Sequence, residues 1–145
     1  MTRRLVVAAA VALLLPLLSA CGGQSYCDAV KAHQSELGSI AGSGRHTALL
    51  QALPIFEDLQ GKAPGDVADD WQLVVTRIRA LKTALEQAHV DPASYDPKHP
   101  PAGLSSADWA RIRQAAAGLA APDTAQALAS VQQEVLDVCH TPLEL

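Results

Sequence analysis

Apolar residues recur along most of the chain at intervals of three and four positions, the spacing that places side chains on one face of an α-helix. The clearest example is a seam with successive separations of 4, 3, 4, 3, 4 and 3, formed by Val67, Trp71, Val74, Ile78, Leu81, Leu85 and Ala88. No stretch of the sequence alternates with the period of two that a half-buried strand requires. The pattern therefore predicts an all-α protein.

Two helices are predicted before this seam. The first begins near Ser25, whose hydroxyl suits a cap with Asp28 three residues later, and it ends at a Gly-Ser-Gly break. The second runs from Thr47 to the residue before Gly61, and Pro54 should kink it or divide it in two because proline lacks a backbone donor. The predicted core residues of the two helices are Val30, Leu37, Ile40, Leu49, Leu50, Leu53, Phe56 and Leu59.

Two more helices are predicted after the seam. The fourth starts at Ser106, with Ser105 as its cap and with Leu104 packed on Trp109 as a hydrophobic staple. The fifth follows an interruption at 121–123 and ends near the last cysteine. Their predicted core residues are Trp109, Ile112, Ala116, Leu119, Leu128, Val131, Val135 and Val138.

The chain begins with a leader of the secretory type. Arg3 and Arg4 precede an apolar run from Leu5 to Leu18, about 14 residues, which is too short for a bilayer that needs about 20. The sequence LSAC that ends at Cys21 resembles the bacterial lipobox, in which the cysteine is joined to diacylglycerol before the signal peptide is cut off. The alternative is an ordinary secretory signal with a cysteine near its cleavage site.

The lipobox resemblance divides the chain into a signal peptide (1–20), a lipidated tether (21–24) and a helical bundle domain (25–145). It implies that Cys21 carries two or three fatty acids such as palmitate, which suffice for stable anchoring. We therefore expect a lipoprotein on the outer (extracytoplasmic) face of the cytoplasmic membrane.

The other two cysteines, Cys27 and Cys139, remain as a pair in a compartment that permits oxidation. We predict a disulfide between them, which would close a loop of about 112 residues. The alternatives are two buried thiols or a shared metal site.

A proline-rich segment dominates the expected topology. Residues 91–103 hold four of the nine prolines, so they are predicted to form a non-helical strap. A disulfide needs Cα atoms within about 7 Å, but five strictly alternating helices would put Cys27 and Cys139 at opposite ends. We therefore expect the strap to cross the bundle face, so that the third and fourth helices run roughly parallel. The rival topology has a fourth helix too short to count as a pass, with the fifth returning alone.

The charge balance limits the partners. The chain has 11 basic and 15 acidic side chains, and Arg3 and Arg4 leave with the signal, so the mature part carries a net charge of about −6. This balance disfavours nucleic acid and electrostatic adhesion to anionic lipid, both of which need basic patches. We expect the acyl chains to hold the membrane, and we expect no nucleic acid partner.

The candidate binding surface lies on the strap, where Tyr95, Asp96, Lys98 and His99 stand on a stiff loop. Long ordered loops often bind partners. The alternative is that the strap only reconnects helices, with Tyr95 packed onto them.

The other polar and aromatic residues favour structural roles. Asp66, Asp69 and Asp70 suit the positive end of a helix dipole better than a paired-carboxylate site. Trp71 and Trp109 are interpreted as core residues rather than as walls of a ligand pocket. No catalytic motif occurs, and we expect no cofactor and no metal, because no metal-binding spacing links the five histidines His33, His46, His89, His99 and His140.

Several stretches together carry a family resemblance: the lipobox, YCDAV at 26–30, APGDVADDW at 63–71, the strap from VDPASYDP to PPAGLS, and VCHTPL near the end. On these the mature chain resembles small secreted actinobacterial lipoproteins, a family of unknown function. Within APGDVADDW, Gly65 stands where the resemblance leads us to expect an acidic residue. The resemblance supports the location and the cysteine pair, and it implies no specific activity.

Two functions of different classes are compatible with these features. The first is a lipid-anchored cell-envelope binding or scaffold protein that recognises an envelope protein or a small ligand. The alternative is a small envelope hydrolase or redox protein whose site is assembled from separate helices, for instance from His140, Asp28 and His33.

Overall fold

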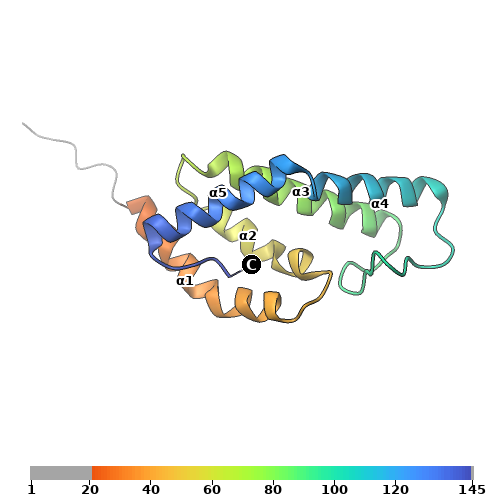
Figure 1. Ribbon diagram of the computed structural model, residues 1–145, viewed down its shortest axis with the longest axis horizontal. Coiled ribbons are helices and arrows are strands. Elements are labelled where there is room, and N and C mark those ends of the chain that lie inside the picture. The colour runs from red at the N-terminus through yellow and green to blue at the C-terminus, as the bar shows by residue number, and fades with distance from the viewer. Residues whose placement is uncertain (1–20, 145) are drawn as a thin grey trace, which may run out of the picture.

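The computed structural model describes residues 21–144, which fold into five helices without a strand in that range. The helices are α1 (Cys21–Gly42), α2 (Ala48–Gln60), α3 (Ala68–Gln87), α4 (Ser106–Leu119) and α5 (Pro122–Cys139). The predicted all-α class and helical bundle are confirmed (Figure 1). The predicted signal peptide, residues 1–20, lies outside the described residues.

The helix starts follow local chemistry, with one correction at α1. Ser105 caps α4 as predicted, because its hydroxyl accepts a hydrogen bond from the backbone N–H of Asp108 at 3.0 Å. The helix α1 begins at Cys21, so the predicted cap at Ser25 is wrong and the proposed tether 21–24 has helical backbone. The helix α2 is not divided at Pro54, whose side chain is exposed.

The contacts along α3 show the directions in which α4 and α5 run. Gln87 near the end of α3 is hydrogen-bonded to Arg111 of α4, whereas Arg77 lies beside Gly118 at the end of α4 and pairs with Asp123 at the start of α5. As the residue numbers of the contacting residues increase along α4 and α5, the residue numbers of their partners on α3 decrease. Both of these helices run antiparallel to α3, one after the other (Figure 1).

The prediction that the third and fourth helices run parallel is therefore wrong. That prediction assumed that α4 crosses the length of the bundle by itself. Instead, α4 and α5 together cross it once, as one pass that is interrupted at Pro122. The rival topology, in which α4 is not a separate pass, is closer to the structure. The chain thus crosses the bundle four times, which brings the start of α1 and the end of α5 together without a strap that crosses the bundle.

The disulfide between Cys27 and Cys139 is confirmed, with the two Cα atoms 5.1 Å apart. It joins the first turns of α1 to the last turn of α5. After α5 the chain turns at His140, which has a left-handed φ of 52°, and the side chain of Leu143 is buried in the core. The cross-link thus holds the start of α1 beside the end of α5, and the tail after α5 returns along α1, where Glu144 lies next to Gly38.

The strap is non-helical, as predicted, and it covers the other end of the bundle. Val90 and Tyr95 are buried, and the backbone carbonyl of Ala93 lies 3.5 Å from the hydroxyl of Thr47, just before α2. The strap therefore joins the neighbouring ends of α3 and α4 while it packs on the turn between α1 and α2.

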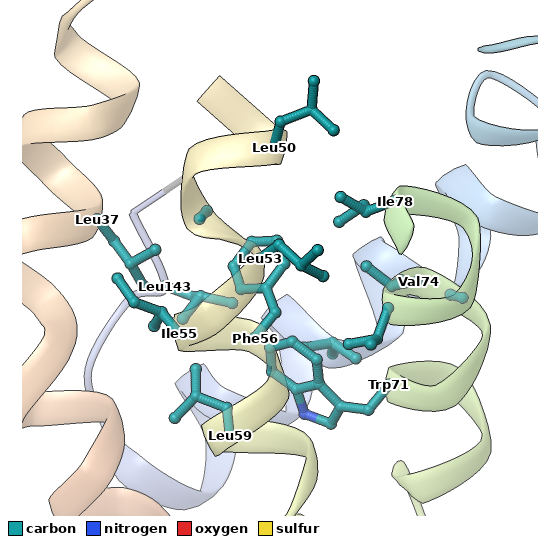
Figure 2. Packing of buried hydrophobic residues seen from close by; sticks show 14 of the residues in the cluster. Leu37, Leu50, Leu53, Ile55, Phe56, Leu59, Trp71, Val74, Ile78 and Leu143 are labelled. Carbon is teal, nitrogen blue, oxygen red and sulfur yellow. The ribbon is translucent and has the colours of Figure 1, made fainter. Parts of the chain in front are cut away.

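The core is centred on Trp71 of α3. Its indole N–H donates a 2.7 Å hydrogen bond to the hydroxyl of Tyr26 on α1, and both side chains are fully buried. The Phe56 ring lies 5.5 Å from the Trp71 ring (Figure 2). Trp71 is thus a core residue, as predicted, and its one polar atom is satisfied inside the core.

The predicted core faces are mostly confirmed. All seam residues from Val67 to Leu85 are buried, and Ala88 packs against their edge. Val138 is a wrong prediction, because its side chain is 46% exposed. After Thr124 and Ala127, the buried positions of α5 advance by four residues at a time through Val131 and Val135 to the disulfide-linked Cys139. This spacing turns the valine that precedes Cys139 outward.

We expect the variant Cys27→Ala/Cys139→Ala to lose about 4–5 kcal/mol of unfolding free energy, because its unfolded chain regains the entropy of a loop of 112 residues. Urea unfolding measures the loss. The wild-type protein under reducing conditions should match the variant, and equal stability of oxidised wild type and variant would contradict the assignment.

We expect Tyr26→Phe to cost about 1–3 kcal/mol, because it leaves the buried indole N–H of Trp71 without its acceptor. Tyr95→Phe removes a hydroxyl from the same residue type and leaves the Trp71 contact intact, so it is the matched control. Equal unfolding free energies for the two variants would show that the hydrogen bond contributes nothing.

Candidate functional site

The predicted binding surface on the strap is only partly accessible. The side chain of Tyr95 is 8% exposed, so it packs on the bundle. The Asp96 carboxylate accepts a 2.8 Å hydrogen bond from the backbone N–H of Lys98 and contacts Nδ1 of His99, also at 2.8 Å. The hydrogen bond with His99, followed by that from the backbone of Lys98, lowers the pKa of Asp96. Lys98 and His99 are the members of this surface that remain exposed, and binding there stays a prediction.

The histidines are dispersed over the molecule. His46 precedes α2, His89 follows α3, and His99 and His140 lie on the strap and after α5. Among residues 21–144, no group of three or more His, Cys, Asp or Glu side chains is placed to hold a metal ion.

His33 is the histidine with a partner on another helix. Its Nε2 lies 3.1 Å from a carboxylate oxygen of Asp58 on α2, and Lys62 also pairs with this carboxylate. The hydrogen bond from Lys62, followed by the contact with His33, lowers the pKa of Asp58. The three residues line an open hollow of about 540 Å³ together with Ser25 and Asp28. This pairing could not be predicted from the sequence, because 25 positions separate His33 from Asp58.

The hollow brings together part of the constellation considered for catalysis. Asp28 and His33 both line it, but His140 is not among its lining residues. Ser25 precedes His33 by eight positions on α1, about 12 Å of helix rise, which is beyond hydrogen-bond reach. The hollow thus holds an oriented histidine without an adjacent hydroxyl nucleophile.

The acidic start of α3 faces another acid. Asp69 and Asp70 lie in the first turn of α3, as the dipole argument predicted. Partial burial, and then the negative charges of Asp66 and Asp137, raise the pKa of Glu134 on α5. Asp66 and Asp137 are exposed and Glu134 is half-buried, so this cluster of carboxylates is an acidic surface in contact with solvent.

A second hollow is a groove between α3 and α4, with a volume of about 560 Å³. Arg77 and Arg79 of α3 and Arg111 of α4 line it, together with Gln87 and Gln114. No acidic side chain occurs among the described residues that line the groove. This basic surface could not be predicted from the sequence, because its arginines are grouped only when α4 packs antiparallel on the second half of α3.

Comparison of the chain with protein-family models, with curated proteins and with solved structures gave no match. Within residues 21–144, none of the helices combines the length and the apolar character needed to cross a membrane.

We expect Asp58→Asn to lower the melting temperature slightly at neutral pH, because it removes the charge that pairs with Lys62 and His33. A carboxyl whose pKa is lowered by folding contributes stability above its unfolded pKa of about 3.9, and this contribution is lost as the pH falls through the folded value. The difference from wild type should therefore close in acid. Thermal unfolding over a pH series measures it.

Glu36→Gln is the control for this pH series, because it removes one negative charge from an exposed position of α1. A difference between wild type and Asp58→Asn that stays constant into strong acid would contradict the assigned ion pairs.

Proposed function

We propose that the protein is a lipid-anchored binding or scaffold module on the outer face of the cytoplasmic membrane, of the kind represented by small secreted actinobacterial lipoproteins. The lipobox before Cys21 supports the anchor. The partner is an envelope protein or a small ligand, and the module holds it near the membrane.

The observation that carries this proposal is the position of the disulfide relative to the groove. Cys27 lies six positions after Cys21 and is cross-linked to the end of α5, so the acylated residue belongs to that end of the bundle. The α3–α4 groove lies on the opposite half, because α4 packs on the last turns of α3 (Figure 1). An anchor at Cys21 would leave the groove accessible to a partner away from the bilayer.

The charge of the bundle also supports an acyl anchor. The mature chain has a net charge of about −6, so anionic lipid repels it overall. Fatty acids supply an attraction that does not depend on charge, about 0.8 kcal/mol for each buried methylene. Two or three chains are therefore sufficient to hold an acidic domain at the membrane.

The contact between His33 and Asp58 is the one observation that favours the alternative, a small envelope hydrolase. A carboxylate that orients a histidine is a common feature of general bases. The binding function is better supported, because the hollow beside His33 is open and its serine lies too far away to be activated. The redox form of the alternative is weaker still, since Cys139 is 5% exposed and its disulfide links two helix ends in the core.

We expect Cys21→Ala to move the protein from the membrane fraction to the soluble fraction and to remove the acyl mass from the mature chain. Quantitative blotting of fractionated cells and intact-mass spectrometry measure the two effects. The matched control is Cys27→Ala, which removes a cysteine six positions away and should stay on the membrane with its acyl groups. Retention of unacylated Cys21→Ala on the membrane at the wild-type level would refute the lipid anchor.

A further inference from the structure

We propose that the groove between α3 and α4 binds an extended acidic peptide segment of a partner protein. The inference rests on the proposed binding function and specifies the chemistry of the partner. The groove would recognise carboxylates through the guanidinium groups of Arg77, Arg79 and Arg111.

The charged side chains that line the groove are all basic, in contrast to the net charge of the molecule, and each of these arginines is paired with a carboxylate outside the lining. The mature chain carries a net charge of about −6, whereas the described residues that line the groove include three arginines and no acid. Local concentration of one sign of charge in a depression attracts ligands of the opposite sign. The surrounding negative surface would repel acidic segments that approach elsewhere, which confines them to this site.

The arginines are already ion-paired, but these pairs can be exchanged. Arg79 is paired with Glu57 on α2 at 2.6 Å, and Arg111 is paired with Asp108 on α4. Both arginine side chains are more than half exposed, and exposed pairs of this kind contribute about 0–1 kcal/mol. Neither acidic partner lines the groove. A ligand carboxylate can therefore replace or share these contacts at little cost.

Arg77 has a more fixed position at the end of the groove. It crosses α4 at Gly118, where an added Cβ would lie 3.1 Å from Nη1 of the guanidinium, and its Nη2 donates to Asp123 at 3.2 Å. Its Nε–H is buried and has no hydrogen-bond partner among the described residues. Because this N–H is inaccessible, a ligand carboxylate at this end of the groove would contact the terminal N–H groups of the guanidinium, which has a fixed planar geometry.

The shape of the groove favours an extended chain over a compact small molecule. The ten positions from Arg77 to Gln87 correspond to about 15 Å of helix, the length of four to five extended residues. Small-molecule sites usually enclose most of the ligand surface, but this groove is open along its length. Its floor includes the small residues Ala80, Ala84 and Ala115. The side-chain amides of Gln87 and Gln114 add donors and acceptors suited to a peptide backbone.

The experiment measures binding of a fluorescently labelled hexaglutamate peptide to the full-length mature protein in a neutral detergent, by fluorescence anisotropy. We expect binding that weakens as salt is added, because exposed charge contacts are screened. Hexaglutamine, which has the same length without the charges, should bind at least about tenfold more weakly, a difference of roughly 1.4 kcal/mol.

The test variant is Arg79→Gln/Arg111→Gln, which removes two groove charges at exposed positions and should weaken hexaglutamate binding about tenfold. The matched control is Arg45→Gln/Arg113→Gln, which has the same change in net charge outside the groove and should stay within about twofold of wild type. Gly118→Ala, which displaces the Arg77 guanidinium, should also weaken binding. Circular dichroism and melting temperatures verify that each variant is folded.

Three results would overturn the inference: no hexaglutamate binding at low salt, equal losses in the groove and control variants, or binding of inorganic polyphosphate with no binding of hexaglutamate. The last result would assign the groove to phosphate polymers instead. Membrane attachment is measured separately through Cys21, so a protein that stays anchored and does not bind the peptide loses this inference alone. A protein that binds the peptide without being acylated loses the anchor and keeps the groove.

Discussion

The cross-link between Cys27 and Cys139 is the constraint on which the arrangement of the helices depends. Because the two cysteines belong to the first and the last helix, the chain must cross the bundle an even number of times between them. The five helices meet this condition because α4 and α5 share one pass. The disulfide also defines the end of the bundle that belongs to the N-terminus, and hence which surfaces a tether at Cys21 would bring near a membrane.

The junction between α4 and α5 shows how a single pass can be interrupted without losing its direction. The backbone carbonyl of Gly118 accepts a 2.8 Å hydrogen bond from the buried hydroxyl of Thr124, and Arg77 spans the same point from α3 to Asp123. Pro122 can begin a new helix because the first helical position needs no backbone donor. The break separates two halves of α3 with different neighbours: α5 packs on the half that carries the core residue Trp71, and α4 borders the open groove.

The local features of the fold could be predicted from the sequence, because each depends on residues close together in the chain. The cap at Ser105, the seam through Trp71 and the end of α5 at Cys139 are such features. The direction of α4 could not be predicted, because the same proline signal marks a reversal of the chain and an interruption within a pass. The candidate sites were missed for a related reason. The contact of His33 with Asp58 and the grouping of three arginines arise only from the packing of helices.

The distribution of charge connects the fold with the proposed function. An acidic surface that extended over the whole bundle would repel both an anionic membrane and an acidic partner. The structure instead combines acids such as Asp66 and Glu134 at the disulfide end with arginines in the groove at the other end. On a molecule tethered at Cys21, the first group would keep the bundle from lying flat on anionic lipid, and the second would attract a partner from the side away from it. With such a tether, each half of the bundle would have an electrostatic role that the net charge alone does not reveal.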